Sequence, residues 1–318
     1  MAVGSSAPQR EEPVPYTPPA PVSRPRNVIT VNVSEWFQST AFSGIIKFSH
    51  WPKYERRVEQ GIHLTLSLLR KYDIKATFFI LGIVAREFPE MVKMIAQEGH
   101  EIGTMGYYNR RLHEIPPADY IKELEMSIPL LKSLSRQDIV THRAPEWSVT
   151  QHTLWVMDAL RSFGVKYDSS IYPVNSILYG IEDAPRHPYI LNPSGIIEFP
   201  PTTYRFAGKN VALFGGTNLR VSPYSIISMA MQSLNNEGRH VLVHVYPWEM
   251  EGEFPRFDLG FDGYMQQYAG LKNTFSRISG LCQEFTFDTI SGVLAEDPPA
   301  ESVHINTLSG RRKENLFQ

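Results

Sequence analysis

The chain has 318 residues, of which 42% are hydrophobic and 20% are charged, enough apolar side chains for one large α/β domain or two smaller ones. Its 31 Lys and Arg residues balance 33 Asp and Glu residues, and the net charge of −2 gives no support for a general nucleic-acid binder or a polybasic membrane binder. The single cysteine, Cys282, excludes an internal disulfide and a cysteine-rich zinc module.

Residues 1–26 carry 7 of the 24 prolines and almost no large apolar side chains. Such a segment buries too little surface to offset its ordering entropy, so we expect a flexible polyproline-like arm that serves as a linker or as a docking peptide. The arm has neither the basic start nor the apolar run of a secretory signal. This favours the cytoplasm, or the periplasm or cell exterior if a leader has been removed.

Between residues 27 and 294, apolar strands alternate with helical stripes. The pattern predicts strands at 28–33, 75–82, 100–106, 138–142, 165–170, 196–200 and 240–247, and helices at 57–72, 89–97, 120–134, 154–163 and 223–235. Repeated strand–helix–strand units indicate parallel βαβ topology, and uninterrupted apolar strands indicate a sheet that is covered on both faces. We therefore predict an α/β fold, a complete or incomplete (β/α) barrel, with functional residues on loops at the carboxyl ends of the strands.

Residues 295–318 lose this hydrophobic periodicity, and we expect a flexible tail there. Its last five residues, ENLFQ, resemble a protease-tag remnant and are excluded from the fold prediction.

Seven segments near the predicted strand ends carry a family resemblance. They are, in chain order, TVNVSEWF, KATFFILG, GHEIGTMGY, HRAPEWS, VKYDSSIYP, EFPPTT and HVYPWEM. They resemble the polysaccharide deacetylases of the NodB-homology fold, carbohydrate esterase family four, and most of all the branch associated with exosortase and exopolysaccharide clusters. The resemblance implies a distorted (β/α) barrel over 27–294. It also implies N-deacetylation of glycans by a divalent metal on one acidic residue and two histidines, with an Asp base and a His acid.

The chain departs from that family at each of the base, acid and metal-ligand positions. The positions are Asn32 for the base, Ser34 or Glu35 for the acidic metal ligand, Met105 and Asn109 for the metal histidines, and Tyr246 for the acid. An amide has no useful basicity near neutral pH, a thioether is too soft a ligand for zinc, and a phenol is a poor substitute for an imidazole. These changes predict a degenerate active site, a pseudoenzyme that needs no metal or other cofactor. The family's Arg, which orients the base, is retained as Arg143.

Other side chains of these motifs could still contact a sugar. The candidates for substrate binding are Trp36, Tyr107, Trp147, Asp168, Trp248 and Glu249. Aromatic faces stack on sugar rings, and a few polar groups set the orientation of the ligand. Each aromatic residue could instead pack in the core, and Arg143 could instead pair with Asp168 or Glu249.

Three functions stay open at this point. The favoured one is a degenerate deacetylase that binds glycan, or acts as an accessory subunit, in exopolysaccharide biosynthesis or processing. Its partners would be a polysaccharide or oligosaccharide with N-acetylhexosamine and other proteins of that assembly. The second is an active, metal-dependent N-deacetylase that hydrolyses amide bonds with zinc or another divalent metal on relocated ligands, drawn from Glu35, His50, His113 and His244. The third is an interaction scaffold that acts through its surface and its proline-rich arm.

Overall fold

The structure is a computed structural model that describes residues 25–176 and 179–308. Nearly all of the predicted arm and the tag-like ENLFQ segment lie outside the described residues. Residues 302–308, which the sequence assigned to a flexible tail, instead form a strand, β12 (Ser302–His304), and a short helix, α12 (Ile305–Leu308). Because β12 pairs with a strand of the main sheet, the ordered part of the chain extends past residue 294.

The core of the molecule is a sheet of ten strands. They are β1 (Asn27–Val33), β2 (Thr77–Ile80), β3 (Glu101–Thr104), β4 (Thr141–His142), β5 (Tyr167–Asp168), β6 (Tyr189–Asn192), β7 (Ile196–Glu198), β10 (Leu242–Val245), β11 (Phe287–Asp288) and β12. The order is β10-β1-β2-β3-β4-β5-β7-β6-β12, with β11 also paired to β1. All these pairs are parallel except β6 with β7, so the predicted parallel topology is confirmed for the strands that carry the family motifs.

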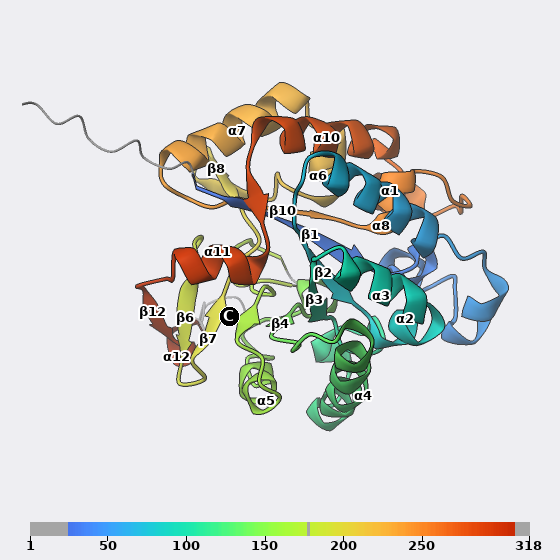
Figure 1. Cartoon of the computed structure of the whole chain (residues 1–318), viewed down its shortest axis with the longest axis horizontal. Helices are drawn as coiled ribbons and strands as arrows, with labels where there is room; N and C mark the ends of the chain where they lie inside the picture. The colour runs from blue at the N-terminus through green and yellow to red at the C-terminus, as the bar shows by residue number, and fades with distance from the viewer. Residues whose placement is uncertain (1–24, 177–178, 309–318) are drawn as a thin grey trace, which may run out of the picture.

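Helices surround the sheet, as Figure 1 shows. They are α1 (Val58–Lys71), α2 (Gly82–Glu87), α3 (Pro89–Gln97), α4 (Pro117–Ser135), α5 (Val156–Ser162), α6 (Gly216–Val221), α7 (Tyr224–Asn236), α8 (Pro247–Glu251), α9 (Gly260–Gln267), α10 (Thr274–Glu284) and α11 (Ile290–Glu296). In α1, the predicted stripe of Val58, Ile62, Leu66 and Leu69 is buried, as an amphipathic helix on a sheet requires. A separate hairpin, β8 (Tyr204–Phe206) and β9 (Lys209–Val211), has no counterpart among the predicted elements.

The sheet is strongly curled. Strands β1 and β4 are separated by β2 and β3, which in a flat sheet would place them about 14 Å apart at the usual spacing of about 4.8 Å. Nevertheless, Arg143, directly after β4, donates hydrogen bonds to Thr30 Oγ1 (2.8 Å) and Asn32 Oδ1 (2.9 Å) on β1. The segment after β7 also reaches β10, where the Leu242 N–H donates to Thr202 Oγ1 (2.8 Å). The predicted α/β barrel-like fold is thus confirmed, although no strand ladder joins β10 to β12 within the described residues.

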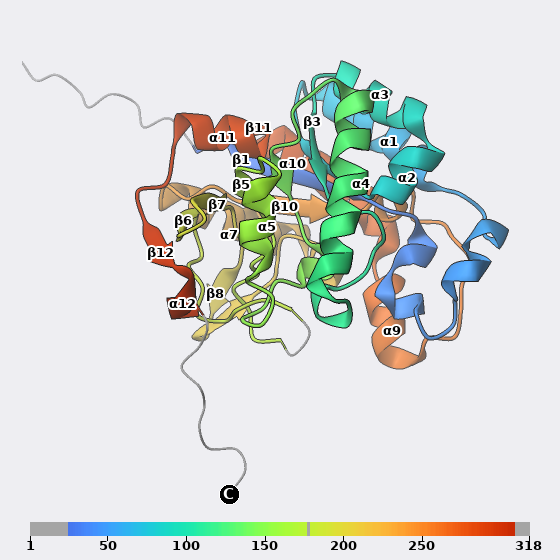
Figure 2. The same cartoon turned by 90° about the horizontal axis from the view of Figure 1, so that it is seen from below.

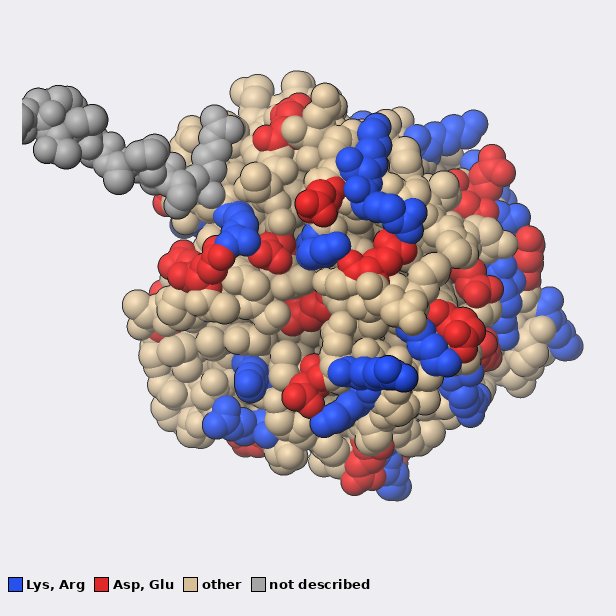
Figure 3. All heavy atoms as spheres, in the orientation of Figure 1, with Lys and Arg blue, Asp and Glu red and all other residues tan. Residues whose placement is uncertain are grey.

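The surface carries mixed charge. Figure 3 shows basic and acidic side chains interspersed over the face seen in Figure 1, in keeping with the net charge of −2. Among the described helices, none combines the length and apolar character that crossing a bilayer requires.

Candidate functional site

A cavity of about 240 Å³, here called the inner pocket, lies where several strands end. Its lining includes Ser34 after β1, Asn109 after β3, Trp147 after β4, and His244 and Tyr246 at the end of β10. Loops at the carboxyl ends of parallel strands meet at one edge of a sheet, and this edge is where the sequence placed the functional residues. The inner pocket therefore occupies the position expected for an active site in this fold.

Asn32, at the position that the family resemblance implies for the base, lies beneath this pocket in a hydrogen-bond network. Asn32 is buried, and its Oδ1 accepts a hydrogen bond from Arg143 Nη1 (2.9 Å). The guanidinium also donates to the Ser169 carbonyl (3.0 Å) and hydroxyl (2.7 Å), and burial lowers the Arg143 pKa to about 10, so the group stays charged. No ion pair of Arg143 with Asp168 or Glu249, the alternative left open by the sequence, occurs among the described residues. Arg143 instead orients an amide that cannot accept a proton from water.

Two further side chains, His244 on β10 and Tyr246 directly after it, line the inner pocket in neutral forms. Burial, together with the Glu146 and Glu249 carboxylates, raises the pKa of Tyr246, whose phenol is also hydrogen bonded to Asn32. Burial and the nearby Arg143 charge lower the pKa of His244 to about 3. The His244 ring lies 4.5 Å from the Trp147 ring, centroid to centroid. At neutral pH these groups can donate and accept hydrogen bonds, but neither is poised to transfer a proton.

The residues at the positions that the family resemblance implies for metal ligands point in different directions. Ser34, not Glu35, lines the inner pocket. The Glu35 Oε2 accepts the Arg57 backbone N–H (3.0 Å), so the carboxylate faces the start of α1, and burial raises its pKa to about 7. Met105 packs in the main apolar core, and Asn109 donates from Nδ2 to the Gln38 carbonyl (2.8 Å). A hydroxyl, a buried thioether and an amide do not fit a divalent zinc-type ion.

The relocated ligands considered from the sequence also lie apart. Among the described residues, no group of three His, Cys, Asp or Glu side chains is placed to hold a metal ion. His113 lines a different cavity near residues 150–152, and His50 lies in the 3-10 turn Phe48–Lys53. Only His244 faces the inner pocket.

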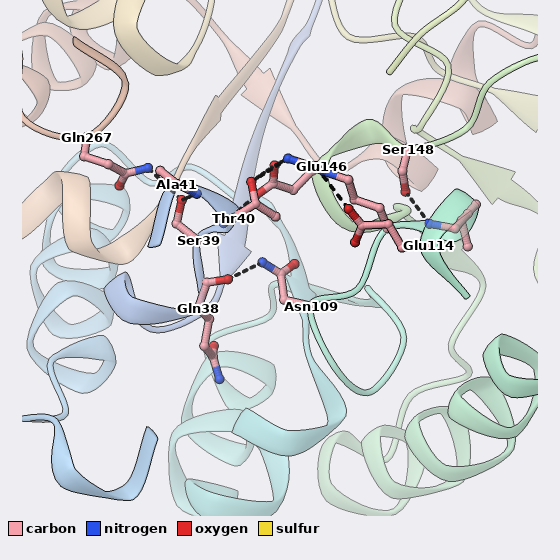
Figure 4. A network of polar contacts seen from close by, with 11 residues as sticks. Gln38, Ser39, Thr40, Ala41, Asn109, Glu114, Glu146, Ser148 and Gln267 are labelled. Carbon is pink, nitrogen blue, oxygen red and sulfur yellow. Dashed lines mark hydrogen bonds and ion pairs between the residues drawn. The ribbon is translucent and has the colours of Figure 1, made fainter. Parts of the chain in front are cut away.

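Glu146 and Trp147 reach the inner pocket from a strained turn. Both residues have positive φ angles (52° and 51°), which are costly for side chains larger than glycine and cluster at functional sites. The Glu146 carboxylate accepts hydrogen bonds from the Thr40 N–H (3.1 Å) and hydroxyl (2.5 Å), as Figure 4 shows, and pairs with Arg111 (3.2 Å). It is therefore engaged in holding the loop after β1.

Asp168 lies away from the inner pocket in a buried polar chain. His142 Nδ1 is 2.6 Å from Asp168 Oδ1, and its Nε2 is 2.7 Å from the Tyr120 hydroxyl. Burial raises the Asp168 pKa, but the interactions with His142 and the hydrogen bonds with Glu198 and Ser170 together outweigh this effect and lower it overall. Burial and the adjacent Asp168 raise the pKa of Glu198 well above its usual range. The geometry places Asp168 in the framework, where a ligand in the pocket would not contact it.

The predicted sugar-binding aromatic residues are distributed over three environments. Trp147 and Trp248 line the inner pocket, and Trp248 stacks on Tyr246 at 5.3 Å. Trp36 is fully buried in a separate aromatic cluster, and Tyr107 is buried in the main core. Glu249 lines the pocket, but its carboxylate is bound by Arg220 (2.9 Å) and by the Tyr246 N–H (3.0 Å).

A second cavity of about 400 Å³, here called the outer groove, adjoins the inner pocket. Its aromatic lining is Phe37, Phe48, Trp51 and Tyr108. Ser39 and Asn109 line both cavities, so the two meet at these residues. Figure 2 shows the segment that forms this groove beside α9, and the α9 residue Gln267 donates to Ser39 Oγ (2.6 Å) in Figure 4.

Several residues of the inner pocket carry buried polar atoms that lack a partner. Trp147 Nε1, Trp248 Nε1, Asn109 Oδ1 and Gln267 Oε1 form no hydrogen bond with any described residue. Buried unpaired groups are rare and costly, and each calls for a water molecule or a ligand.

Glu146, Tyr172 and Gln267 are among the lining residues that were not predicted from the sequence. Glu146 lies within the HRAPEWS motif, directly before Trp147, so that motif was the signal that could have identified it. Tyr172 lies in the YDSSIYP segment and packs 5.7 Å from Trp147. Gln267 comes from α9, which no periodicity predicted, so no local pattern could have identified it.

Comparison with known proteins agrees with this architecture. Residues 54–167 match the family profile described as polysaccharide deacetylase, and residues 169–295 match a domain of unknown function, DUF3473. A peptidoglycan deacetylase of Helicobacter pylori is 36% identical over 117 residues, which are 36% of this chain and 38% of that protein. A peptidoglycan-N-acetylglucosamine deacetylase of Bacillus cereus is 30% identical over 116 residues, 33% of this chain and 42% of that protein. The matches thus span about two fifths of these relatives.

A solved structure extends the similarity of fold to most of the chain. A Mycobacterium smegmatis protein assigned to the polysaccharide deacetylases superposes with a TM-score of 0.57, covering 90% of this chain and 94% of that one at 21% identity. At this identity the likeness shows the fold alone.

Proposed function

We propose that this chain, which carries a polysaccharide deacetylase domain and so belongs to that family, binds a glycan in the inner pocket without deacetylating it. The strand-end motifs resemble the exopolysaccharide-associated branch of that family, and this resemblance supports an accessory role in exopolysaccharide biosynthesis or processing. The ligand class follows the named relatives, which act on peptidoglycan, and we expect an oligosaccharide that contains N-acetylhexosamine.

One observation carries the proposal. The Glu35 carboxylate, at one of the two positions that the family resemblance allows for the acidic metal ligand, faces the start of α1, while Ser34 and Asn109 line the pocket. Without a metal, the acetyl carbonyl has no Lewis acid to polarise it, and without a base the attacking water keeps its proton. Asn32 and Tyr246 supply neither function.

The retained features of the inner pocket favour sugar binding. Trp147 presents an indole beside His244, and Tyr246 stacks on Trp248. Hydroxyl and amide side chains also line the pocket and can form hydrogen bonds with the hydroxyl groups of a sugar. Aromatic faces with a few polar groups are the usual composition of a small-ligand site.

Calorimetric titration with N-acetylglucosamine oligomers tests this function. We expect binding that a chelator leaves unchanged, and no release of acetate from the same oligomers. Trp147→Ala should weaken binding by about tenfold or less, since an aromatic contact contributes about 0.5–1.5 kcal/mol. Trp147→Phe, which keeps an aromatic face, should retain most of the affinity.

The control is Phe206→Ala, in the β8–β9 hairpin, because Phe206 is 69% exposed and lines neither cavity. Circular dichroism of each variant verifies that it is folded. About one equivalent of tightly bound zinc, together with acetate release that a chelator abolishes, would overturn the proposal in favour of an active deacetylase.

A further inference from the structure

We infer that the outer groove is a second sugar subsite that continues the inner pocket, so that the two together bind an oligosaccharide of several sugar units. This inference rests on the proposed function, because the inner pocket would hold one unit or one end of the same oligosaccharide. The two cavities meet at Ser39 and Asn109. The inner pocket, at about 240 Å³, is below the range of about 300–1,000 Å³ that is usual for ligand sites, whereas the two cavities together lie well within it.

The outer groove exposes an aromatic face. Phe48 is 56% exposed, and its ring lies 4.7 Å from the Trp51 ring and 5.4 Å from the Tyr108 ring. The Tyr108 contact is edge-on, with an interplanar angle of 85°. A large apolar ring that is fixed by two neighbours yet left exposed is well suited to stack against the C–H face of a sugar.

The charges of the outer groove favour a neutral occupant. The Arg110 guanidinium binds the Glu123 carboxylate with two hydrogen bonds (2.8 and 2.5 Å). The Glu114 carboxylate pairs with Arg111 (3.2 Å). Lys47 is the one charged lining residue without an ion pair to a described side chain. The remaining polar lining consists of hydroxyl and amide groups, which match the hydroxyls of an uncharged sugar.

The wall between the two cavities is fixed before any ligand binds. Figure 4 shows three separate elements that hold the loop after β1: Asn109 bonds the Gln38 carbonyl, Glu146 bonds Thr40, and Gln267 bonds Ser39. Glu123 on α4 in turn accepts the N–H groups of Tyr107 and Tyr108 (2.9 and 2.7 Å), which fixes the loop that carries Asn109. A preformed site loses less conformational entropy on binding.

The test is a calorimetric length series on the full chain, from N-acetylglucosamine through its dimer to longer oligomers. We expect affinity to rise beyond the length that fills the inner pocket. Phe48→Ala should weaken the binding of long oligomers by about two- to tenfold, with less than a twofold effect on the monosaccharide. Phe48→Trp should restore the affinity for long oligomers, and Phe206→Ala, the same substitution at another exposed site, should leave all affinities unchanged.

Three outcomes would overturn the inference in distinguishable ways. Monosaccharide binding that depends on Trp147, with no effect of chain length or of Phe48→Ala, would remove the second subsite and leave the proposed function intact. No binding of any oligomer would remove both. Binding of a peptide with the sequence of residues 1–24 that Phe48→Ala abolishes, without sugar binding in the groove, would assign the groove to a proline-rich segment.

Discussion

Single side chains decide what the pocket can do, and Glu35 is the most informative of them. From the sequence it was the one strong metal ligand left in the first motif, and either Ser34 or Glu35 could take that position. The structure turns its carboxylate toward the backbone N–H groups of Arg57 and Val58, where a helix start favours an acceptor. Side-chain direction at a strand end depends on tertiary contacts, so the sequence left this choice open.

The buried Glu35 carboxyl predicts a specific pH dependence. Its pKa is about 7 in the folded protein because of burial, and 4.5 is its ordinary value. Between these two pH values the folded protein holds a proton on Glu35 that the unfolded protein has released. The protonated carboxyl therefore contributes fully to stability below pH 4.5, and this contribution is lost as pH rises through about 7. Relative to Glu35→Gln, the wild type should lose about 1 kcal/mol of unfolding free energy per pH unit between pH 5 and 7. Urea unfolding of both proteins across this range measures the difference, and parallel curves would contradict the assignment.

At the scale of elements, the sequence predicted the parallel strands and the helices between them because both follow from hydrophobic periodicity. It identified β1, β2, β3 and β10 and the helices α1, α3 and α7 to within two residues at each end. Strand β6 with its antiparallel pairing to β7, the β8–β9 hairpin and α9 were not predicted, because short or irregular segments show too little hydrophobic periodicity. The outer groove is built largely from the 3-10 turns of residues 36–53, and for that reason it could not be predicted either.

A buried ion pair joins α6 to α8. Arg220 and Glu249 are fully buried at 2.9 Å, and the guanidinium lies 5.7 Å from the Trp248 ring. Removal of one partner leaves the other charge buried and unpaired, so Arg220→Leu should lower the unfolding free energy by about 3–5 kcal/mol. The double variant Arg220→Leu/Glu249→Leu should cost less than the single change, because it leaves no uncompensated charge. A double-mutant cycle by chemical unfolding measures this coupling, and simple additivity would show that the pair is not coupled.

At the scale of the whole molecule, helix α8 links the outer helix α1 to the lining of the inner pocket. Helix α8 begins at Pro247, directly after Tyr246, and packs against α1 on the outside of the sheet. The closest approach is at Gly61, where an added Cβ would lie 2.2 Å from the Pro247 carbonyl oxygen. Sequence periodicity predicted α1 but not this contact, because a glycine in a helix gives no sign of which backbone it faces.

Gly61→Ala should therefore act on both stability and binding. The methyl group meets backbone atoms, which cannot move aside as a flexible side chain would, so α1 and α8 must separate. Overpacking of this kind costs about 1–3 kcal/mol of unfolding free energy, and the shift of Pro247 should displace Tyr246 and Trp248 and so weaken binding of N-acetylglucosamine oligomers. Gly44→Ala is the matched control, because nothing lies within 4 Å of a Cβ added there. We expect it to change stability by less than about 0.5 kcal/mol. If Gly61→Ala loses stability but keeps its full affinity for the oligomers, the outer helices do not position the pocket.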